Sequence, residues 1–361
     1  MLFKSSPLKN HQYHRYIGRK WLVLALLALV LFTTVLLALS VGSSGILLPE
    51  IIRAILGSGE PSSRIIVWNI RMPRIATGVG VGIALAMAGC IMQNVLRNPL
   101  ASSSTLGVSQ GASFGAAVAI IYFGGGIQTT SPSASMITFT NPFTVVIFAF
   151  LGGITTTLLI LLLSQVVSVS PSTMILAGVA ISAMFTGATA LMQYFADDNR
   201  VASVVYWTFG NLGRTGAREI FLIYLLSLIA FLYFMFNRWN YNAMESGADA
   251  AKSLGVNADM LILISMTVAT LISAVAIAFV GTITFIGLIA PHIVRRFVGN
   301  DYRFLIPCSA LMGAVVMLGA DILSRTISAP AILPIGAITS FLGGPLFLYL
   351  IIKQGKKRQY G

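Results

Sequence analysis

Charged residues are scarce in this sequence. Asp, Glu, Lys and Arg make up only 9% of its 361 residues, whereas 57% are hydrophobic, and the mean hydropathy is +0.88. A soluble globule of this size needs far more charge to cover its surface, so a soluble protein is excluded. The composition predicts an all-α polytopic membrane protein, because backbone groups in lipid are satisfied within helices.

Cysteine is nearly absent as well. Cys90 and Cys308 each lie inside an apolar run, so we expect two small hydrophobic residues rather than a disulfide or a metal site. No nucleophile, metal-ligand cluster or carboxylate pair suggests catalysis, and neither a cofactor nor a metal is expected. An enzyme is therefore disfavoured.

No nucleotide cradle of the form G-x-x-x-x-G-K-[ST] is present. The one Gly-Lys dipeptide, Gly355-Lys356, lies in the C-terminal segment without that spacing. If ATP powers this protein, the ATPase is a separate polypeptide. The net charge of +13 does not indicate nucleic-acid binding, because the basic residues lie in short segments between apolar runs, where they set membrane orientation.

Carboxylates are missing from the centres of the apolar runs. All ten lie in loops or at run ends. Ion-coupled carriers usually bury an ionisable group midway across the membrane, so an ion-driven carrier is disfavoured, although it stays an alternative.

Apolar runs long enough to cross roughly 30 Å of hydrocarbon number about ten. The eighth is short and contains Gly287 and Pro291, which are expected to break it. The predicted spans are 21–41, 75–92, 106–123, 143–167, 173–195, 220–236, 260–280, 283–293, 304–322 and 335–352.

Charge predicts the orientation of these spans. With ten spans, 15 of the 23 Lys and Arg residues lie on the inner side and 8 on the outer side, as the positive-inside bias requires. Both termini are then cytoplasmic in a cell membrane. We expect one domain over residues 1–361, with cytoplasmic basic tails at 1–20 and 353–361 and a cytoplasmic loop at 238–259.

Small residues recur at every fourth position in two spans, which predicts close helix packing. The stripes are Gly78, Gly82, Ala86 and Cys90, and Gly107, Gly111, Gly115 and Ala119.

The polar segment 238–259 interrupts otherwise apolar sequence. Ser246 to Leu254 is predicted to form one or two short helices that stop at Gly255. This segment is the best surface for receiving a separate ATPase.

Three of the eight basic residues on the outer side, where the charge bias disfavours them, are Arg71, Arg74 and Arg325. One explanation is that they meet carboxylates of an external partner. The alternatives are lipid headgroups, or a pair between Arg325 and Asp321 one turn away. The residues alone do not decide between docking to a partner, binding of lipid headgroups and the pair between Arg325 and Asp321. His292, beside Pro291, is expected to satisfy a freed carbonyl more often than to bind a ligand.

Several motifs, in this order, resemble the FecCD-type permeases. They are Arg71-Met-Pro-Arg74, Ala88-Gly89-x-x-x-Gln93, Arg97-Asn-Pro-Leu-Ala101, Leu106-Gly-Val-Ser109, Gly247-x-x-x-Ala251-x-x-Leu254-Gly255, the block from Gly281 through Phe285 to Arg295, Ala320-Asp321 with Arg325, and Leu333-Pro-Ile-Gly336 ahead of Gly343-Gly-Pro-Leu-Phe347. The likeness covers about residues 40–353. It implies the type II permease fold of ABC importers for iron-siderophores, haem and cobalamin.

The resemblance also implies partners and sites. The partners are a cytoplasmic ATPase dimer, a second permease subunit, an extracytoplasmic binding protein and membrane lipid. Arg71, Arg74 and Arg325 would dock the binding protein, and the fifth span would border the pathway, with Met184, Met192 and Tyr194 as possible lining. The residues that would couple to the ATPase are Ser246, Gly247, Asp249, Ala251, Leu254 and Gly255.

This sequence departs from the family pattern at two places on the presumed ATPase side. Ser102-Ser103 stands where an acidic residue and proline are frequent, and Ala248-Asp249 stands where two acids are frequent. The expected cargo is an iron(III)-siderophore, with cobalamin or haem as the alternative.

Overall fold

The computed structural model describes residues 7–42, 46, 48–125, 127–128, 138–139, 141–166 and 171–359. Residue 167, the predicted end of the fourth span, lies outside these residues. The described part is helical apart from one antiparallel pair of two-residue strands, β1 (Ile127–Gln128) and β2 (Thr138–Phe139).

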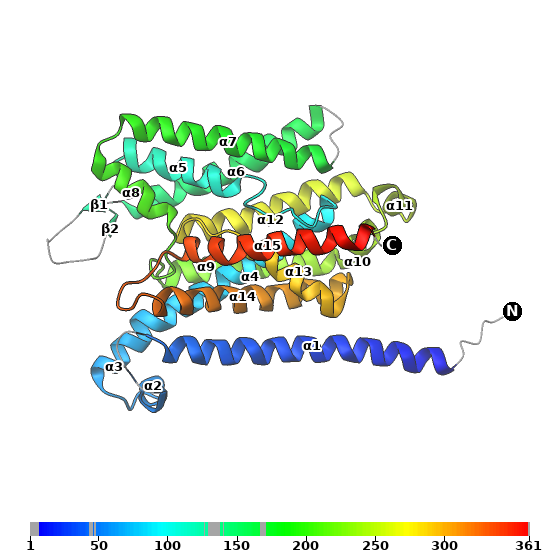
Figure 1. Ribbon diagram of the computed structural model, residues 1–361, viewed down its shortest axis with the longest axis horizontal. Coiled ribbons are helices and arrows are strands. Elements are labelled where there is room, and N and C mark those ends of the chain that lie inside the picture. Colours follow the sequence, from blue (N-terminus) through cyan, green and yellow to red (C-terminus); the bar gives the residue numbers. More distant parts are fainter. Residues whose placement is uncertain are drawn as a thin grey trace.

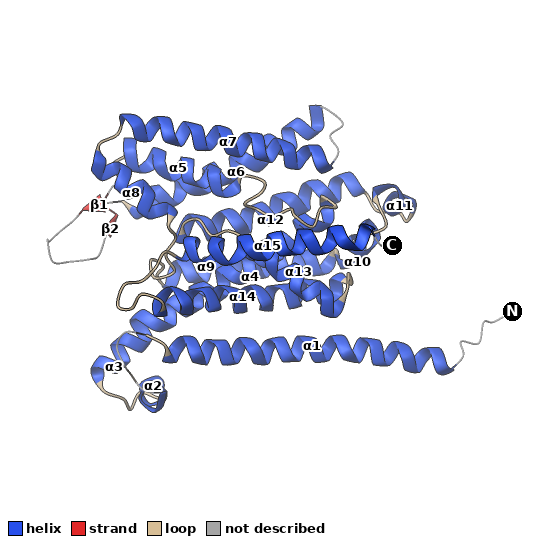
Figure 2. Cartoon of the chain, in the orientation of Figure 1, coloured by secondary structure: helices blue, strands red, loops and turns tan. Residues whose placement is uncertain are grey.

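The helices form a bundle whose long axes run in one common direction (Figures 1 and 2). Their bounds are α1 (Pro7–Ser40), α2 (Leu48–Ile55), α3 (Pro61–Ile65), the π-helical turn η1 (Ile66–Arg71), α4 (Met72–Val95), α5 (Val108–Tyr122), α6 (Pro142–Val166), α7 (Pro171–Phe195), α8 (Asp198–Thr208), α9 (Ala217–Phe236), α10 (Arg238–Met244), α11 (Ala248–Ser253), α12 (Ala258–Val280), α13 (Ile286–Val298), α14 (Tyr302–Thr326) and α15 (Ile335–Gln359).

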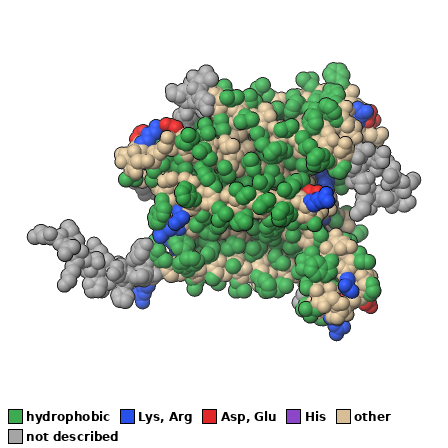
Figure 3. Space-filling model, turned by 180° about the vertical axis from the view of Figure 1, so that it is seen from behind, with side chains coloured by type: hydrophobic (Ala, Val, Ile, Leu, Met, Phe, Trp, Pro, Cys, Tyr) green, Lys and Arg blue, Asp and Glu red, His purple; other side chains and the backbone are tan. Residues whose placement is uncertain are grey.

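The ten predicted spans correspond in order to α1, α4, α5, α6, α7, α9, α12, α13, α14 and α15. Among the described residues, seven helices are long and apolar enough to cross a membrane, and the apolar parts of α5 and α15 are shorter. Apolar side chains cover the middle of the molecular surface, and charged ones gather near its two ends (Figure 3). Such a surface suits a bilayer rather than water.

The two ends of the bundle carry different elements. The start of α1, the last turn of α15, α10 and α11 lie at one end, which we name the α11 end (Figure 1). The elements α2, α3, α8 and the strand pair lie at the other, which we name the α8 end. Residues 7–20 continue the first helix and residues 353–359 continue the last, and their place on the cytoplasmic side stays a prediction.

Small residues let the helices pack closely, as the stripes predicted. A Cβ atom added at Gly82 would collide with the carbonyl oxygen of Gly313 in α14. One added at Gly111 would collide with the carbonyl of Gly152 in α6, and one at Gly115 with that of Phe148. Packing of this kind, rather than the hydrophobic effect, holds helices together in lipid.

The second span is longer than predicted because α3, η1 and α4 form one continuous helical rod, Pro61–Val95. The π turn lies directly before Pro73, with the Met72 N–H bonded to the carbonyl of Val67. Proline lacks an N–H, and a wider turn accommodates the missing bond.

The eighth span is discontinuous, and its predicted bounds are wrong. Residues 281–285 are non-helical, and α13 then continues through Pro291 to Val298. Thirteen helical residues rise only about 20 Å, and the five residues before them add up to about 17 Å. The non-helical backbone is packed in protein, because Thr282 Oγ1 donates to Thr208 O and the adjacent Val280 O accepts from Asn211 N at 2.7 Å.

Candidate functional sites

The segment from α10 to α11 protrudes at the α11 end. Gly247 (φ 115°) precedes α11 and Gly255 (φ 85°) follows it. Both conformations favour glycine, so these residues fix where the short helix starts and stops. The predicted short helix after Ser246 is confirmed, and α10 is a second one upstream.

Within this segment, Leu254 is 72% exposed. Ser246, Asp249 and Gly255 are exposed beside it, whereas Gly247 and Ala251 are buried and act as internal packing. The surface available to a partner is therefore an exposed leucine surrounded by small and polar residues.

Hydrogen bonds tie this segment to the membrane helices. Asn94, near the end of α4, donates through Nδ2 to the carbonyl of Tyr241 at 3.0 Å and to Glu245 Oε1 at 3.4 Å. Glu245 also accepts from Tyr302 Oη at 3.0 Å and from Asn300 Nδ2 at 2.7 Å. The Glu245 carboxylate thus connects α4 with the turn that opens α14.

A buried ion pair joins the first helix to the same turn. Lys20 is 2% exposed, and its Nζ lies 3.2 Å from Asp301 Oδ2. Burial alone would raise the pKa of Asp301, but hydrogen bonds from Arg303 and Lys20 outweigh it and lower the pKa to about 2. Next to it, Asn242 of α10 accepts from the Tyr302 N–H at 2.9 Å.

A second charged cluster lies toward the α8 end. Asp321 is fully buried, with Arg74 Nε 2.8 Å from its Oδ1 and Arg325 Nη2 2.9 Å from its Oδ2. The pair between Arg325 and Asp321, one of the alternatives left open by the sequence, is therefore present.

Arg71 and Arg325 also donate hydrogen bonds to backbone carbonyls at the end of α1. Arg71 donates to Leu39 O, and Arg325 donates to Val41 O at 2.7 Å and to Ala38 O at 3.2 Å. The last carbonyls of a helix lack intrahelical partners and carry partial negative charge, so guanidinium groups suit them.

The three arginines are therefore engaged within the chain and largely shielded. Their role in docking an external protein stays a prediction, and their geometry favours a structural role. Arg53 and Arg64, on α2 and α3 at the same end, are exposed.

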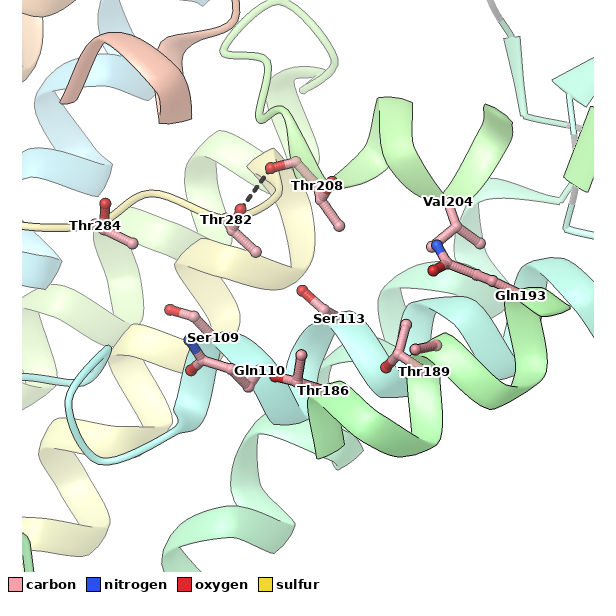
Figure 4. A pocket seen from close by; sticks show the side chains of 11 residues that line it. Ser109, Gln110, Ser113, Thr186, Thr189, Gln193, Val204, Thr208, Thr282 and Thr284 are labelled. Atoms are coloured by element: carbon pink, nitrogen blue, oxygen red, sulfur yellow. Dashed lines mark hydrogen bonds between the residues drawn. The ribbon is translucent and has the colours of Figure 1, made fainter. Parts of the chain in front are cut away.

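A polar cavity of about 330 Å³ lies among α5, α7, α8 and the residues after α12 (Figure 4). Side chains from these four segments converge on it, and none of them is charged. The lining residues are Ser109, Gln110, Ser113, Thr186, Thr189, Ala190, Gln193, Val204, Thr208, Thr282 and Thr284.

The predicted lining residues are on the expected helix, α7, but they do not line this cavity. Met184 and Tyr194 are 72% and 81% exposed, and Met192 packs against the hydrophobic core. Thr186, Thr189 and Gln193 line it instead, at a spacing that puts them on one helix face. That polar stripe was visible in the sequence.

His292 is half-buried in α13, and the described residues contain no group of three His, Cys, Asp or Glu residues that could hold a metal ion. Cys90 and Cys308 are both buried and unpaired with one another.

An all-helical, multi-pass bundle with a protruding helical segment at one end and a polar cavity inside has the form of a transport permease. The chain belongs to the FecCD transport family, whose profile matches residues 28–353. This confirms the resemblance found in the sequence, and with it the assignment as a membrane permease.

Similar proteins agree with this assignment. A protein of Methanocaldococcus jannaschii, described as a candidate ABC transporter permease, is 48% identical over 96% of this chain and 98% of its own. The hemin transport system permease HmuU of Yersinia pestis is 34% identical over 81% and 85% of the two chains. The iron(3+)-hydroxamate permease FhuB of Bacillus subtilis is 33% identical over 87% and 78%.

A solved structure has the same fold. It is described as an inward-facing conformation of a candidate metal-chelate type ABC transporter. It superposes with a TM-score of 0.76 at 28% identity and covers 92% of this chain and 99% of its own.

Proposed function

We propose that this chain is the permease subunit of an ABC importer that takes up an iron(III)-siderophore. Family membership supports the importer, and the relatives named for iron(3+)-hydroxamate and hemin support an iron-containing cargo. The chain would pair with a second permease subunit in a cell membrane and receive cargo from an extracytoplasmic binding protein.

Coupling to a separate ATPase dimer would occur at the α11 end, through Ser246 to Gly255. The observation that carries this proposal is the exposed Leu254 on a segment whose inner side is held by Asn94 and Glu245. A partner that binds Leu254 and shifts this segment would move α4 and α14 with it, through the hydrogen bonds that Asn94 and Tyr302 donate to the segment. The α11 end, where α1 starts and α15 ends, would then face the cytoplasm.

Cross-linking tests this surface directly. A Leu254→Cys variant should form a disulfide with a cysteine in the permease-facing groove of the ATPase, and Leu56→Cys at the other end of the bundle should not. A reversed pattern would reject the assignment of sides.

The cargo has two alternatives, haem and cobalamin. Uptake of radiolabelled iron-siderophore, haem and cobalamin by a deficient strain carrying the whole gene set separates them. An ion-driven carrier is a further alternative, and it requires uptake that survives ATP depletion and collapses with an uncoupler.

A further inference from the structure

Cations and aromatic rings meet at the α11 end, where residues of α1, α10 and α14 contact one another. Lys20 Nζ lies 3.2 Å from Asp301 Oδ2, and Arg303 Nη2 lies 2.8 Å from the same oxygen. The Arg303 guanidinium also lies over the rings of Trp239 and Phe304, at 4.9 and 5.7 Å from the ring centroids. Attraction between a cation and a ring face adds to the ion pairs. These side chains therefore form one connected group.

The cations of this group outnumber its carboxylates. Arg238, at the start of α10, is a third cation, and its guanidinium lies 5.7 Å from the ring centroid of the tryptophan that follows it. The carboxylate of the group, that of Asp301, pairs with the other two cations. Three cations against this carboxylate leave a formal charge of +2. The exposed Arg19 adds one more positive charge, so the group stays cationic even when the neighbouring Glu245 is counted.

The group lies at the level where α1 leaves the hydrocarbon. From Trp21 to Ser40 this helix rises about 29 Å, close to the roughly 30 Å thickness of the hydrocarbon core. Arg19 lies about 3 Å beyond Trp21, at headgroup level. Trp21 is 59% exposed and Trp239 is 55% exposed, and half-exposed tryptophans are typical of the membrane–water boundary. We name this group the basic–aromatic cluster; its members are Arg19, Lys20, Trp21, Arg238, Trp239 and Arg303.

The same face of α1 continues into the hydrocarbon as an apolar stripe. Leu22, Leu26 and Leu29 follow Arg19 at spacings of three, four and three residues, which places all of them on one face of the helix. The three leucines are 59%, 50% and 57% exposed. A ligand that covers this whole surface needs an anionic head for the cations and long apolar chains for the leucines. A phospholipid has both, whereas a soluble ATPase would reach only the charged part.

We propose that the basic–aromatic cluster binds the headgroup of an anionic phospholipid from the leaflet on the α11 side. The phosphate accepts charge-assisted hydrogen bonds from Arg19 and Arg238, while the acyl chains lie along the leucines of α1. Lys20 and Arg303 stay paired with Asp301 and hold α1 against α14 beneath the headgroup. Because α10 belongs to the segment proposed to receive the ATPase, the bound lipid links that segment to α1. The proposal does not depend on the identity of the cargo.

The test compares two lipids on the purified full-length permease. Protein washed free of lipid in a neutral detergent is titrated with phosphatidylglycerol, or with phosphatidylcholine of the same acyl chains, and bound lipid is counted by native mass spectrometry. We expect saturable binding of phosphatidylglycerol, at least about tenfold tighter than that of phosphatidylcholine, because each cation near a headgroup favours an anionic lipid about fivefold. Equal binding of the two lipids would overturn the proposal.

Variants assign the bound lipid to the cluster. Arg19→Gln with Arg238→Gln leaves the ion pairs of Asp301 in place and should weaken phosphatidylglycerol binding by about fivefold for each lost cation. Arg19→Lys with Arg238→Lys keeps the charge and should retain most of the binding. Arg53→Gln with Arg64→Gln is the matched control, because it removes the same charge from exposed positions at the α8 end. An equal loss in this control would show that net charge alone attracts the lipid, which overturns the site.

Two further measurements separate a lipid from other anionic partners. Inorganic phosphate should not displace the bound phosphatidylglycerol, because it cannot cover the leucines of α1. Displacement by phosphate would make the cluster a site for a soluble anion. In the complete importer, the lipid should stay bound when the ATPase assembles, and its release would assign the cluster to the ATPase surface. Either of these two results would overturn the proposal.

Discussion

Arg74 Nε lies 2.8 Å from Asp321 Oδ1, across 247 positions of sequence and between the two helices α4 and α14. The carboxylate is inaccessible to solvent and has a second guanidinium, that of Arg325, on its other oxygen. The cluster of Arg74, Asp321 and Arg325 connects α4 and α14 with α1 at the α8 end of the bundle, because Arg325 also donates hydrogen bonds to the carbonyls at the end of α1.

Asp321→Asn should therefore destabilise the protein strongly. Removing one partner of a buried ion pair leaves uncompensated charge, which typically costs about 3–5 kcal/mol. Thermal unfolding of the purified permease in detergent measures the loss. Asp198→Asn, at an exposed position near the same end, is the control and should change little. Equal stability of the two variants would contradict the structural role.

Arg325→Glu separates the structural role from docking. We expect a lower unfolding temperature, because the new carboxylate would face Asp321 and the carbonyls that now accept from Arg325. If Arg325 instead meets a binding protein directly, docking should weaken, most clearly at low salt, while stability stays unchanged. Binding affinity and unfolding temperature, measured on the same preparation, distinguish these outcomes.

Leu254→Glu should uncouple ATP hydrolysis from transport, because it would place a charge in the proposed contact between the Leu254 side chain and the ATPase. The ratio of cargo transported to ATP hydrolysed by the reconstituted complex is the measurement. Leu56→Glu changes a similarly exposed leucine, at 76%, at the other end of the bundle and should keep the wild-type ratio. Normal coupling by Leu254→Glu would count against the segment.

Asn94→Leu tests the link between this segment and α4. The substitution leaves the Tyr241 carbonyl without its donor, which costs about 1–3 kcal/mol when such a group is buried. We expect the ATPase to bind normally and the transport-to-hydrolysis ratio to fall. Thr267→Val, at an exposed position of α12 where the hydroxyl donates only to Leu263 O, serves as a control. A fall in ATPase binding instead would mean that Asn94 shapes the docking surface itself.

Asp301 gives a pH dependence with a definite sign. Its pKa is lowered to about 2 in the folded protein, against about 3.9 when unfolded. The ionised Asp301 carboxylate therefore stabilises the folded protein fully above about pH 4. This stabilisation is lost as the pH falls from about 4 toward 2. Unfolding temperatures across this range should fall for the wild type, and Asp301→Asn should remove part of that fall. Asp259→Asn, whose carboxylate pairs with Lys252 on the surface, should retain it.

Hydrophobic run length and small-residue spacing predicted most of the bundle. These patterns report burial in lipid and close packing, and both are local properties of the sequence. Residues 283–285 escaped prediction because Ile283 and Phe285 continue the apolar pattern of α13. Side chains of this segment bond to remote elements, as Thr282 Oγ1 does when it donates to the carbonyl of Thr208 at the end of α8.

The sites were predictable to a lesser degree. The short helix α11 could be predicted because glycines bound it, whereas the partners of Glu245 and Asp301 come from remote helices and leave no sequence spacing. On α7, Met184, Met192 and Tyr194 stay the predicted pathway lining, whereas Thr186, Thr189 and Gln193 line the cavity that the structure contains. A helix that is apolar over most of its surface does not reveal which face turns inward.

The central claim is that this permease contains no motor of its own. Its most direct test is accumulation of a radiolabelled iron(III) chelate in lipid vesicles that contain either the permease alone or the permease with its ATPase, binding protein and MgATP. The account predicts accumulation against a gradient only in the complete system. Accumulation by the permease alone, without nucleotide, would contradict it.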